Sequence, residues 1–453
     1  MKKFFVLLIA LLLCALAFTS CGDPKTSAEL MDKIDEKMES LKSYQADVTA
    51  NLSAQLFFGY RCTAGFTGTQ ITIDGDSDGF YYYNMMEGTT KIEDAEKNDL
   101  VETVKSKELE AFHEGKMFVS SEQGDSVQKL YSPLTKDEYI AYLEKQEDAL
   151  DIDFEACVNK NFTKNEDKTW TLTYSGYTKK AVAAIVEAFN ADELFEEEIA
   201  DMEITIHANA DFTVKDMEFK MIFANESTTS TFTMKAEYSK YNEATPIVDT
   251  LDVSQYTEVA DCRLLTDIAD MIEDLQEMEN GSFALNLKQT ISTSSAENSY
   301  TEKDTVTYGK KDGKYFYDVK AFANNEKYDI SYANGKQTVT ASGVNETLDQ
   351  TEEEAREFIN GLIDSAKYTA GKITKITQKE DGVYTITCKP DESLYQPVFA
   401  SLGSSSDNAT QTITITIQDG KITKISSSVT AIAFPAAYGR VEFKLKTECE
   451  FYY

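Results

Sequence analysis

The chain has 453 residues, with 78 Asp and Glu against 44 Lys and Arg, a formal net charge of −34. A surface this acidic disfavours nucleic acid and anionic membrane surfaces as direct partners, because both carry charge of the same sign. Hydrophobic residues make up 42% of the chain, which excludes a disordered protein. Its length exceeds the roughly 250–300 residues at which a single core stops growing, so at least two domains are expected.

The first element in chain order is a signal peptide over residues 1–20. Lys2 and Lys3 precede an apolar run, Phe4 to Phe18, that is too short for a helix to span a ~30 Å hydrocarbon core. The run ends at Thr19-Ser20-Cys21-Gly22, which resembles the lipobox of bacterial lipoproteins, where cleavage precedes a cysteine that is then diacylated. The resemblance implies that Cys21 anchors the chain to a membrane of the cell envelope, outside the cytoplasm. The alternative is an ordinary secretory signal peptide that is cut elsewhere.

The part that follows, residues 21–245, predicts helices placed between many strands. Thr26 and Glu29 form a capping box. An apolar stripe at helical spacing follows it: Leu30, Ile34, Met38 and Leu41. Alternation from Val48 to Ala54 predicts a strand. Two further helices are expected, one from the T-x-x-E box at Thr135 and one over about 178–190.

Five segments recur in the same order in the second half of the chain, which indicates an internal duplication. The paired segments are Asp78–Tyr83 with Asp312–Tyr317, Glu114–Val119 with Asn334–Val339, Thr135–Glu138 with Thr351–Glu354, Lys168–Thr173 with Gly382–Thr387, and Phe232–Glu237 with Phe443–Glu448. Their separation is that of whole domains. We therefore expect two copies of one domain, residues 21–245 and 262–453, joined by a linker over residues 246–261.

The second copy repeats the plan of the first. Its opening helix carries the stripe Leu264, Ile268, Ile272 and Leu275, and its middle helix begins at Thr351. A third helix near 391–402 contains Pro397 and should be broken or short. Asp-Gly and Asn-Gly pairs, such as Asn334-Gly335, predict hairpins between the strands. The predicted fold class is α+β, present twice.

This element order resembles the lipid- and lipoprotein-carrier family that includes LolA, LolB and LppX. The resemblance begins in residues 30–50, whose sequence LMDKIDEKMESLKSYQADVTA runs as a helix through "LKS" into a strand. It implies that each copy is a curved antiparallel sheet, an open half-barrel, with the inserted helices on its concave face. It further implies binding of an acyl chain or another apolar ligand, whose contact residues the sequence does not identify. The alternative is that the helices fill the concavity and leave a solid core.

The cysteines support a second inference from the duplication. Beyond Cys21 the chain has Cys62, Cys157, Cys262, Cys388 and Cys449. Cys388 and Cys449 stand where the first copy has tyrosines, on the apolar faces of their strands. We therefore predict a disulfide between Cys388 and Cys449, with buried free thiols as the alternative.

Motifs for metal or catalytic chemistry are weak. Asp74, Asp76 and Asp78 match the first half of a D-x-D-x-D-G calcium loop, but the twelfth position is Met85, so a hairpin turn is the favoured interpretation. His113 and His207 stand in no metal-binding spacing, and no nucleophile–base pair is visible. We expect no metal, no cofactor and no enzymatic activity.

Two functions from different classes remain. The first is a lipid-anchored binding protein of the cell envelope that holds an acyl chain or another apolar ligand between sheet and helices. The second is a structural or interaction lipoprotein with filled domains that binds a protein or polymer partner.

Overall fold

A computed structural model of the chain describes residues 23–56, 60–75, 79–94, 97, 99–124, 126–148, 157–177, 198–224, 229–264, 267–268, 271–272, 275, 278, 280–293, 296–311, 313–324, 326–341, 344–366, 372–380, 382–406 and 408–453. The chain divides into two compact units, Met1–Tyr256 and Thr257–Tyr453. Each unit is built on one large antiparallel sheet, and neither sheet closes on itself. The described residues are mostly strands with few helices, so the predicted α+β class holds only in part.

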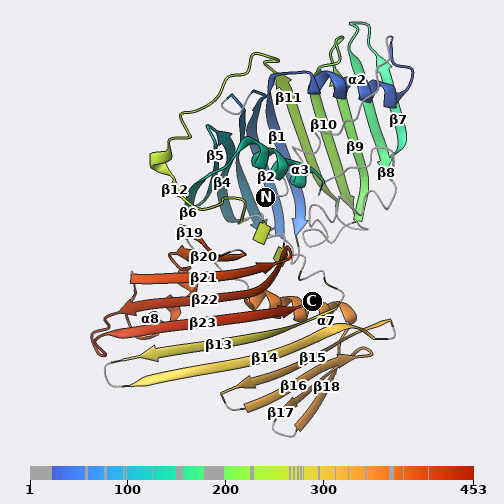
Figure 1. The fold of residues 1–453 in the computed structure, drawn as a ribbon. Helices are drawn as coiled ribbons and strands as arrows, with labels where there is room; N and C mark the ends of the chain where they lie inside the picture. Colours follow the sequence, from blue (N-terminus) through green and yellow to red (C-terminus); the bar gives the residue numbers. More distant parts are fainter. Residues whose placement is uncertain are drawn as a thin grey trace. The chain divides into compact units, whose positions relative to one another are not determined.

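The strands that the first unit contributes to its sheet follow the order β6-β5-β4-β3-β2-β1-β11-β10-β9-β8-β7 (Figure 1). Its strands are β1 (Ser43–Leu56), β2 (Tyr60–Ile73), β3 (Tyr81–Asp94), β4 (Asp99–His113), β5 (Lys116–Gln123), β6 (Ser126–Pro133), β7 (Cys157–Lys164), β8 (Trp170–Tyr177), β9 (Glu198–Ala208), β10 (Val214–Ala224) and β11 (Thr229–Ser239). The unit also contains α2 (Ser27–Glu39), α3 (Lys136–Asp148) and the 3-10 helix η3 (Val253–Gln255). The helix expected over 178–190 lies outside the described residues.

The sheet of the second unit repeats that order as β18-β17-β16-β15-β14-β13-β23-β22-β21-β20-β19. Its strands are β13 (Gly281–Ser292), β14 (Glu297–Lys311), β15 (Lys314–Ala323), β16 (Glu326–Ala333), β17 (Lys336–Ala341), β18 (Val344–Asp349), β19 (Ile373–Glu380), β20 (Val383–Cys388), β21 (Asn408–Gln418), β22 (Lys421–Ala433) and β23 (Val441–Tyr452). The unit also contains β12 (Thr257–Glu258), α7 (Glu352–Ala366), η4 (Glu392–Leu394) and α8 (Gln396–Ser401). The predicted break near Pro397 is confirmed, because η4 and the short α8 stand where one helix would have run.

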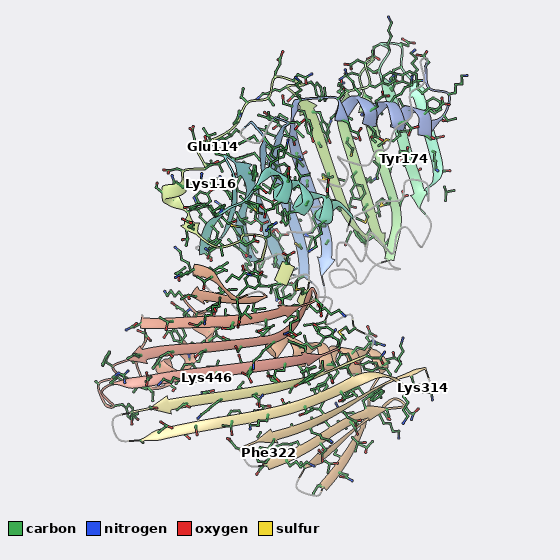
Figure 2. The ribbon with its side chains drawn as sticks, in the orientation of Figure 1. Glu114, Lys116, Tyr174, Lys314, Phe322 and Lys446 are labelled. Atoms are coloured by element: carbon green, nitrogen blue, oxygen red, sulfur yellow. The ribbon has the colours of Figure 1, made fainter. Side chains whose placement is uncertain are left out.

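Matching hairpins and caps mark the repeat within each unit. The four residues of the β4–β5 turn at Glu114-Gly115 and the β16–β17 turn at Asn334-Gly335 all have positive φ, as a two-residue hairpin of this type requires. Figure 2 labels Glu114 in the first of these turns. Gly115 accepts from the amide of Leu134 at 3.0 Å, and Gly335 accepts from that of Gln350 at 3.1 Å. The next residue in each unit is the threonine that caps α3 or α7. These turns therefore provide a common reference for comparing the two units.

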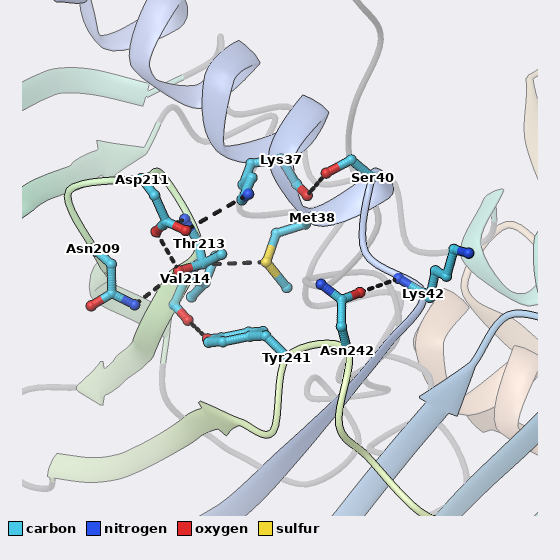
Figure 3. Close-up of polar contacts among 10 residues, drawn as sticks. All are labelled: Lys37, Met38, Ser40, Lys42, Asn209, Asp211, Thr213, Val214, Tyr241 and Asn242. Atoms are coloured by element: carbon cyan, nitrogen blue, oxygen red, sulfur yellow. Dashed lines mark hydrogen bonds and ion pairs between the residues drawn. The ribbon is translucent and has the colours of Figure 1, made fainter.

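Helix α2 packs on the sheet through the stripe that the sequence predicts. Thr26 accepts from the amide of Glu29, and Leu30 and Ile34 are buried against β1 and β8–β11. The end of the helix makes polar contacts with the start of β10 and the turn before it, and Lys42, just after the helix, contacts Asn242 (Figure 3). There the Val214 amide donates to Met38 Sδ, Lys37 pairs with Asp211 at 3.7 Å, and the Lys42 amide donates to Asn242 Oδ1 at 2.7 Å. The stripe of the second opening helix is likewise buried, from Leu264 to Leu275.

The helices α2 and α3 lie on one face of the first sheet, which we call the helix face (Figure 1). Strand register carries this face from Ala46, beneath α2, through Gln70 to Asn84 and Glu110, beneath α3. The opposite face of β2–β5 is covered by the connecting segment, residues 246–256. There Tyr81 Oη donates to the Ile247 carbonyl and accepts from the Ile247 amide, both at 2.9 Å. Leu251 and Tyr256 are buried in the same cluster. Much of the predicted linker thus packs on the first unit.

Candidate functional site: a buried polar cluster beneath helix α3

The residues that the sequence singled out do not converge on one site. Cys21 lies outside the described residues, as do Asp76 and Asp78. Asp74 is exposed and pairs with Lys136 Nζ at 3.1 Å. Among the described residues, no group of three or more His, Cys, Asp and Glu side chains is arranged to hold a metal ion. Within the same residues, no helix has the length and apolar character needed to cross a membrane.

The predicted Cys388–Cys449 disulfide is absent from the structure, in which both thiols are buried and neither forms a disulfide. Cys388 is on β20 and Cys449 is on β23, with β21 and β22 between them. Three strand spacings amount to roughly 14 Å, whereas a disulfide needs Cα atoms within about 7 Å. Cys388 instead donates to Gln411 Oε1 at 3.2 Å. The two tyrosine-to-cysteine differences therefore do not mark sites in contact.

The two histidines have local partners. His207 Nδ1 lies 2.6 Å from Asp216 Oδ1, on the face of the sheet opposite α2. His113 packs its ring edge against Tyr81 at 5.6 Å between ring centroids. Both match the expectation of surface or satisfied polar residues.

A row of polar side chains crosses the helix face of the first sheet beneath α3. Gln70 on β2 pairs in register with Asn84 on β3, which pairs in register with Glu110 on β4. Directly paired residues have Cβ atoms about 4.5–5.5 Å apart, so these three side chains are neighbours. Tyr82, two residues before Asn84, lies on the same face because side chains alternate along a strand.

Aromatic residues of α3 cover this row. Tyr139 donates to Glu110 Oε1 at 2.8 Å, and Tyr142 donates to Glu110 Oε2 at 3.4 Å. The Tyr139 ring lies 4.8 Å from that of Phe112 and 5.7 Å from that of Tyr82, measured between centroids. Burial holds the pKa of both Tyr82 and Tyr139 well above the usual value, so both phenols stay protonated. We call Gln70, Tyr82, Asn84, Glu110, Tyr139 and Tyr142 the buried polar cluster.

Three atoms of the cluster make no hydrogen bond of ordinary geometry with the described residues: Gln70 Oε1, Tyr82 Oη and Asn84 Oδ1. The Asn84 side chain nevertheless lies close enough to the Tyr82 hydroxyl to oppose the effect of burial and lower its pKa. The residues that carry them are 1–2% exposed, so bulk water does not satisfy these atoms. A buried polar group without a partner costs about 1–3 kcal/mol. Three adjacent ones call for a specific explanation, and a polar ligand group that completes the site is one.

The second unit has apolar residues at the matching positions. Counted from the reference turns, Glu110 corresponds to Ile330, and register then matches Asn84 with Val319 and Gln70 with Val306. Tyr82 corresponds to Tyr317, whose hydroxyl accepts from Gln337 Nε2 at 2.6 Å and donates to Gln350 Oε1 at 3.2 Å. The first unit has Met117 and Leu134 in place of these two glutamines. The unpaired cluster is therefore particular to the first unit and does not follow from the shared topology.

Sequence reasoning missed this cluster because it matched Tyr317 with Tyr83, whereas strand register matches it with Tyr82. A shift of one residue moves every side chain of a strand to the other face. The available signal was the tract Tyr81–Met86, in which Asn84 interrupts apolar residues that occupy both faces of a strand.

Comparisons with known proteins leave the family open. No protein-family model and no curated protein sequence matches the chain. Among solved structures, the ywiB protein from Bacillus subtilis is 12% identical, with 40% of this chain and 99% of that chain covered and a TM-score of 0.14. A DUF1329 family protein from Desulfovibrio piger is 12% identical, with coverage of 40% and 89% and a TM-score of 0.17. A β-barrel-like DUF1849 protein from Brucella abortus is 13% identical, with coverage of 44% and 96% and a TM-score of 0.10. Scores this low carry no argument about fold or function.

Proposed function

We propose that the chain is a lipid-anchored binding protein of the cell envelope, with its ligand held between the sheet and helices of the first unit. The ligand is an acyl chain or another largely apolar molecule with a polar group at its inner end. The observation that carries this proposal is the set of unpartnered buried atoms on Gln70, Tyr82 and Asn84. The proposal retains the resemblance to the LolA, LolB and LppX family and its half-barrel, with the role assigned to one copy.

The apolar interior on the other side of β1 from the cluster is rich in methionine. The helix face of β9–β11 carries four buried methionines: Met202, Met217, Met221 and Met234. Methionine is unbranched and flexible, and it is common on surfaces that accept varied apolar partners. The strands of the second sheet contain no methionine, and β21 and β22 present Ile413, Ile415 and Ile425 instead. Branched side chains have fewer rotamers and favour a fixed core.

Native mass spectrometry with organic extraction tests the binding proposal on residues 22–453, produced without the anchor and exposed to a cell-envelope lipid extract. We expect a stoichiometric bound molecule. The variant Gln70→Val/Asn84→Val should lose it, whereas the matched Val319→Asn change in the second unit should retain it. A clean apo mass for the unsubstituted protein would contradict the proposal.

Lipid anchoring through Cys21 is tested separately. Labelled palmitate should be incorporated into the full chain in a bacterial host and lost with Cys21→Ala, and the variant should leave the membrane fraction. Labelling that survives Cys21→Ala would remove the anchor from the proposal and leave ligand binding unaffected.

The alternative function, an interaction lipoprotein, is favoured by one observation in the second unit. Every residue of the edge strand β18 is exposed, and Val344 and Leu348 are 70% and 53% exposed. An open edge strand with exposed apolar side chains can add a strand from a partner. Val344→Lys/Leu348→Lys should abolish partner capture if this function holds, and it should leave lipid retention by the first unit unchanged.

A further inference from the structure

The chemistry of the buried polar cluster restricts the polar group that can complete it. The unpartnered Gln70 Oε1 and Asn84 Oδ1 are amide oxygens, which only accept hydrogen bonds. Tyr82 Oη adds lone pairs on the same face, two residues from Asn84. The two amide oxygens therefore require a ligand group that donates hydrogen bonds, and the Tyr82 hydroxyl, which both donates and accepts, can accept a third.

The charge of the cluster disfavours an anionic ligand group. Glu110 is its only formally charged side chain, and it pairs in register with Asn84. A ligand carboxylate or phosphate would place a second negative charge beside Glu110 in a buried setting with no cation in the cluster, which is costly. A hydroxyl avoids that repulsion, but it supplies one donor for three acceptors.

We infer that the polar end of the ligand is a primary ammonium group, which Gln70, Asn84 and Tyr82 would accept and Glu110 would neutralise. The ligand class is a long-chain amine or an amino lipid with a free primary amine. This inference rests on the proposed function and specifies its ligand. An ammonium carries three donors and a charge opposite to that of Glu110, so it meets both requirements of the cluster.

Four probes of equal chain length test the inference by isothermal titration calorimetry on residues 22–453 at physiological salt: decylamine, decyltrimethylammonium, decanol and decanoate. We expect decylamine to bind about tenfold or more tightly than decanol, and decanoate to bind most weakly. Decyltrimethylammonium has the same charge and no N–H donor, so it measures attraction to the acidic surface alone. It should bind about tenfold or more weakly than decylamine.

Two variants test whether the probes bind at the buried polar cluster. Glu110→Gln keeps a partner for Tyr139 and Tyr142 but removes the charge, so it should erase the preference for decylamine over decanol. Asn84→Val should weaken decylamine binding about tenfold. The control Asp304→Asn removes a buried carboxylate from the helix face of the second sheet and should change neither affinity.

The outcomes separate the two proposals. If decanol or decanoate binds as tightly as decylamine, the ammonium assignment is wrong and the ligand-binding function stands. Equal binding of the quaternary probe, or loss of decylamine binding in Asp304→Asn alone, also overturns the assignment. If no probe and no extracted lipid binds, both the assignment and the proposed function fail.

Discussion

Tyr82 and Tyr317 occupy matching positions in the two sheets, but only the hydroxyl of Tyr317 is held between two glutamine side chains. Gln337 and Gln350 bind that hydroxyl in the second unit, and Met117 and Leu134 take their places in the first. The same position in the two sheets thus carries a hydrogen-bonded hydroxyl in the second unit and a hydroxyl without such partners in the first. This difference is the reason that the proposed site lies in the first unit.

Removing the two hydroxyls should have opposite consequences. Tyr317→Phe leaves two glutamines without a partner and should lower the free energy of unfolding of the second unit by about 1–3 kcal/mol. Tyr82→Phe removes an unpartnered hydroxyl and should leave the first unit equally stable or more stable. Trp170 is the only tryptophan and is buried in the first unit, so its fluorescence follows that unit during urea unfolding. A loss of stability in Tyr82→Phe comparable to that in Tyr317→Phe would contradict the assignment of unpaired atoms.

Exchanging the matched pair Asn84 and Val319 extends this test. Asn84→Val replaces an unpaired buried amide with the residue of the second unit, and it should raise the Trp170 unfolding midpoint in the absence of ligand. Val319→Asn buries an amide among apolar residues and should destabilise the second unit by about 1–3 kcal/mol, measured by circular dichroism. If both substitutions destabilise equally, Asn84 is a structural residue and the cluster is not a binding site.

The stability of the second unit should depend on pH through Asp304. Burial, with a smaller contribution from Glu302, raises the pKa of this carboxyl from 3.8 to about 6. The folded state therefore favours the protonated form of Asp304. Its contribution to the free energy of unfolding is complete below pH 3.8 and is lost as the pH rises through about 6. Asp304→Asn should raise the melting temperature at pH 8 by a few degrees and change it little at pH 4. The exposed Asp318→Asn is the control, and an equal response of the two variants would refute the prediction.

Thiol alkylation checks the corrected cysteine assignment. Cys388 and Cys449 are buried, and burial raises the pKa of Cys449 to about 12, so both should react slowly in the native protein. After unfolding without reductant, both should be alkylated completely. If both thiols resist alkylation in the unfolded protein until a reductant is added, the Cys388–Cys449 disulfide exists and the correction is wrong.

The local features of the fold could be predicted from the sequence. The stripe from Leu30, the break at Pro397 and the turn at Asn334-Gly335 each depend on a few neighbouring residues, and each is present in the structure. The T-x-x-E boxes also form their capping contacts, with Thr135 bonded to Glu138 and Thr351 bonded to Glu354. Capping and turn chemistry are decided within one helical or hairpin turn, so they can be predicted from a single sequence.

The site could not be predicted in the same way, because it depends on register between strands distant in the sequence. Gln70, Asn84 and Glu110 become neighbours only when β2, β3 and β4 pair as they do. The disulfide prediction failed for a related reason. Cys388 on β20 and Cys449 on β23 lie on the same face of the sheet, but two strands separate them. Comparison of the two copies shows which residue of one copy corresponds to which residue of the other. It does not show how far apart two residues of the same copy lie across the sheet.

The contact between Tyr81 and Ile247 has a practical consequence for dissecting the protein. A fragment ending at residue 245 would lose both backbone partners of the Tyr81 hydroxyl and would also lose Leu251 and Tyr256 from their cluster. Its β2–β5 surface would then expose Tyr83 and Phe118 to solvent, and the exposed aromatic surface would favour aggregation. A fragment of the first unit intended for ligand assays or crystallisation should therefore extend through Tyr256.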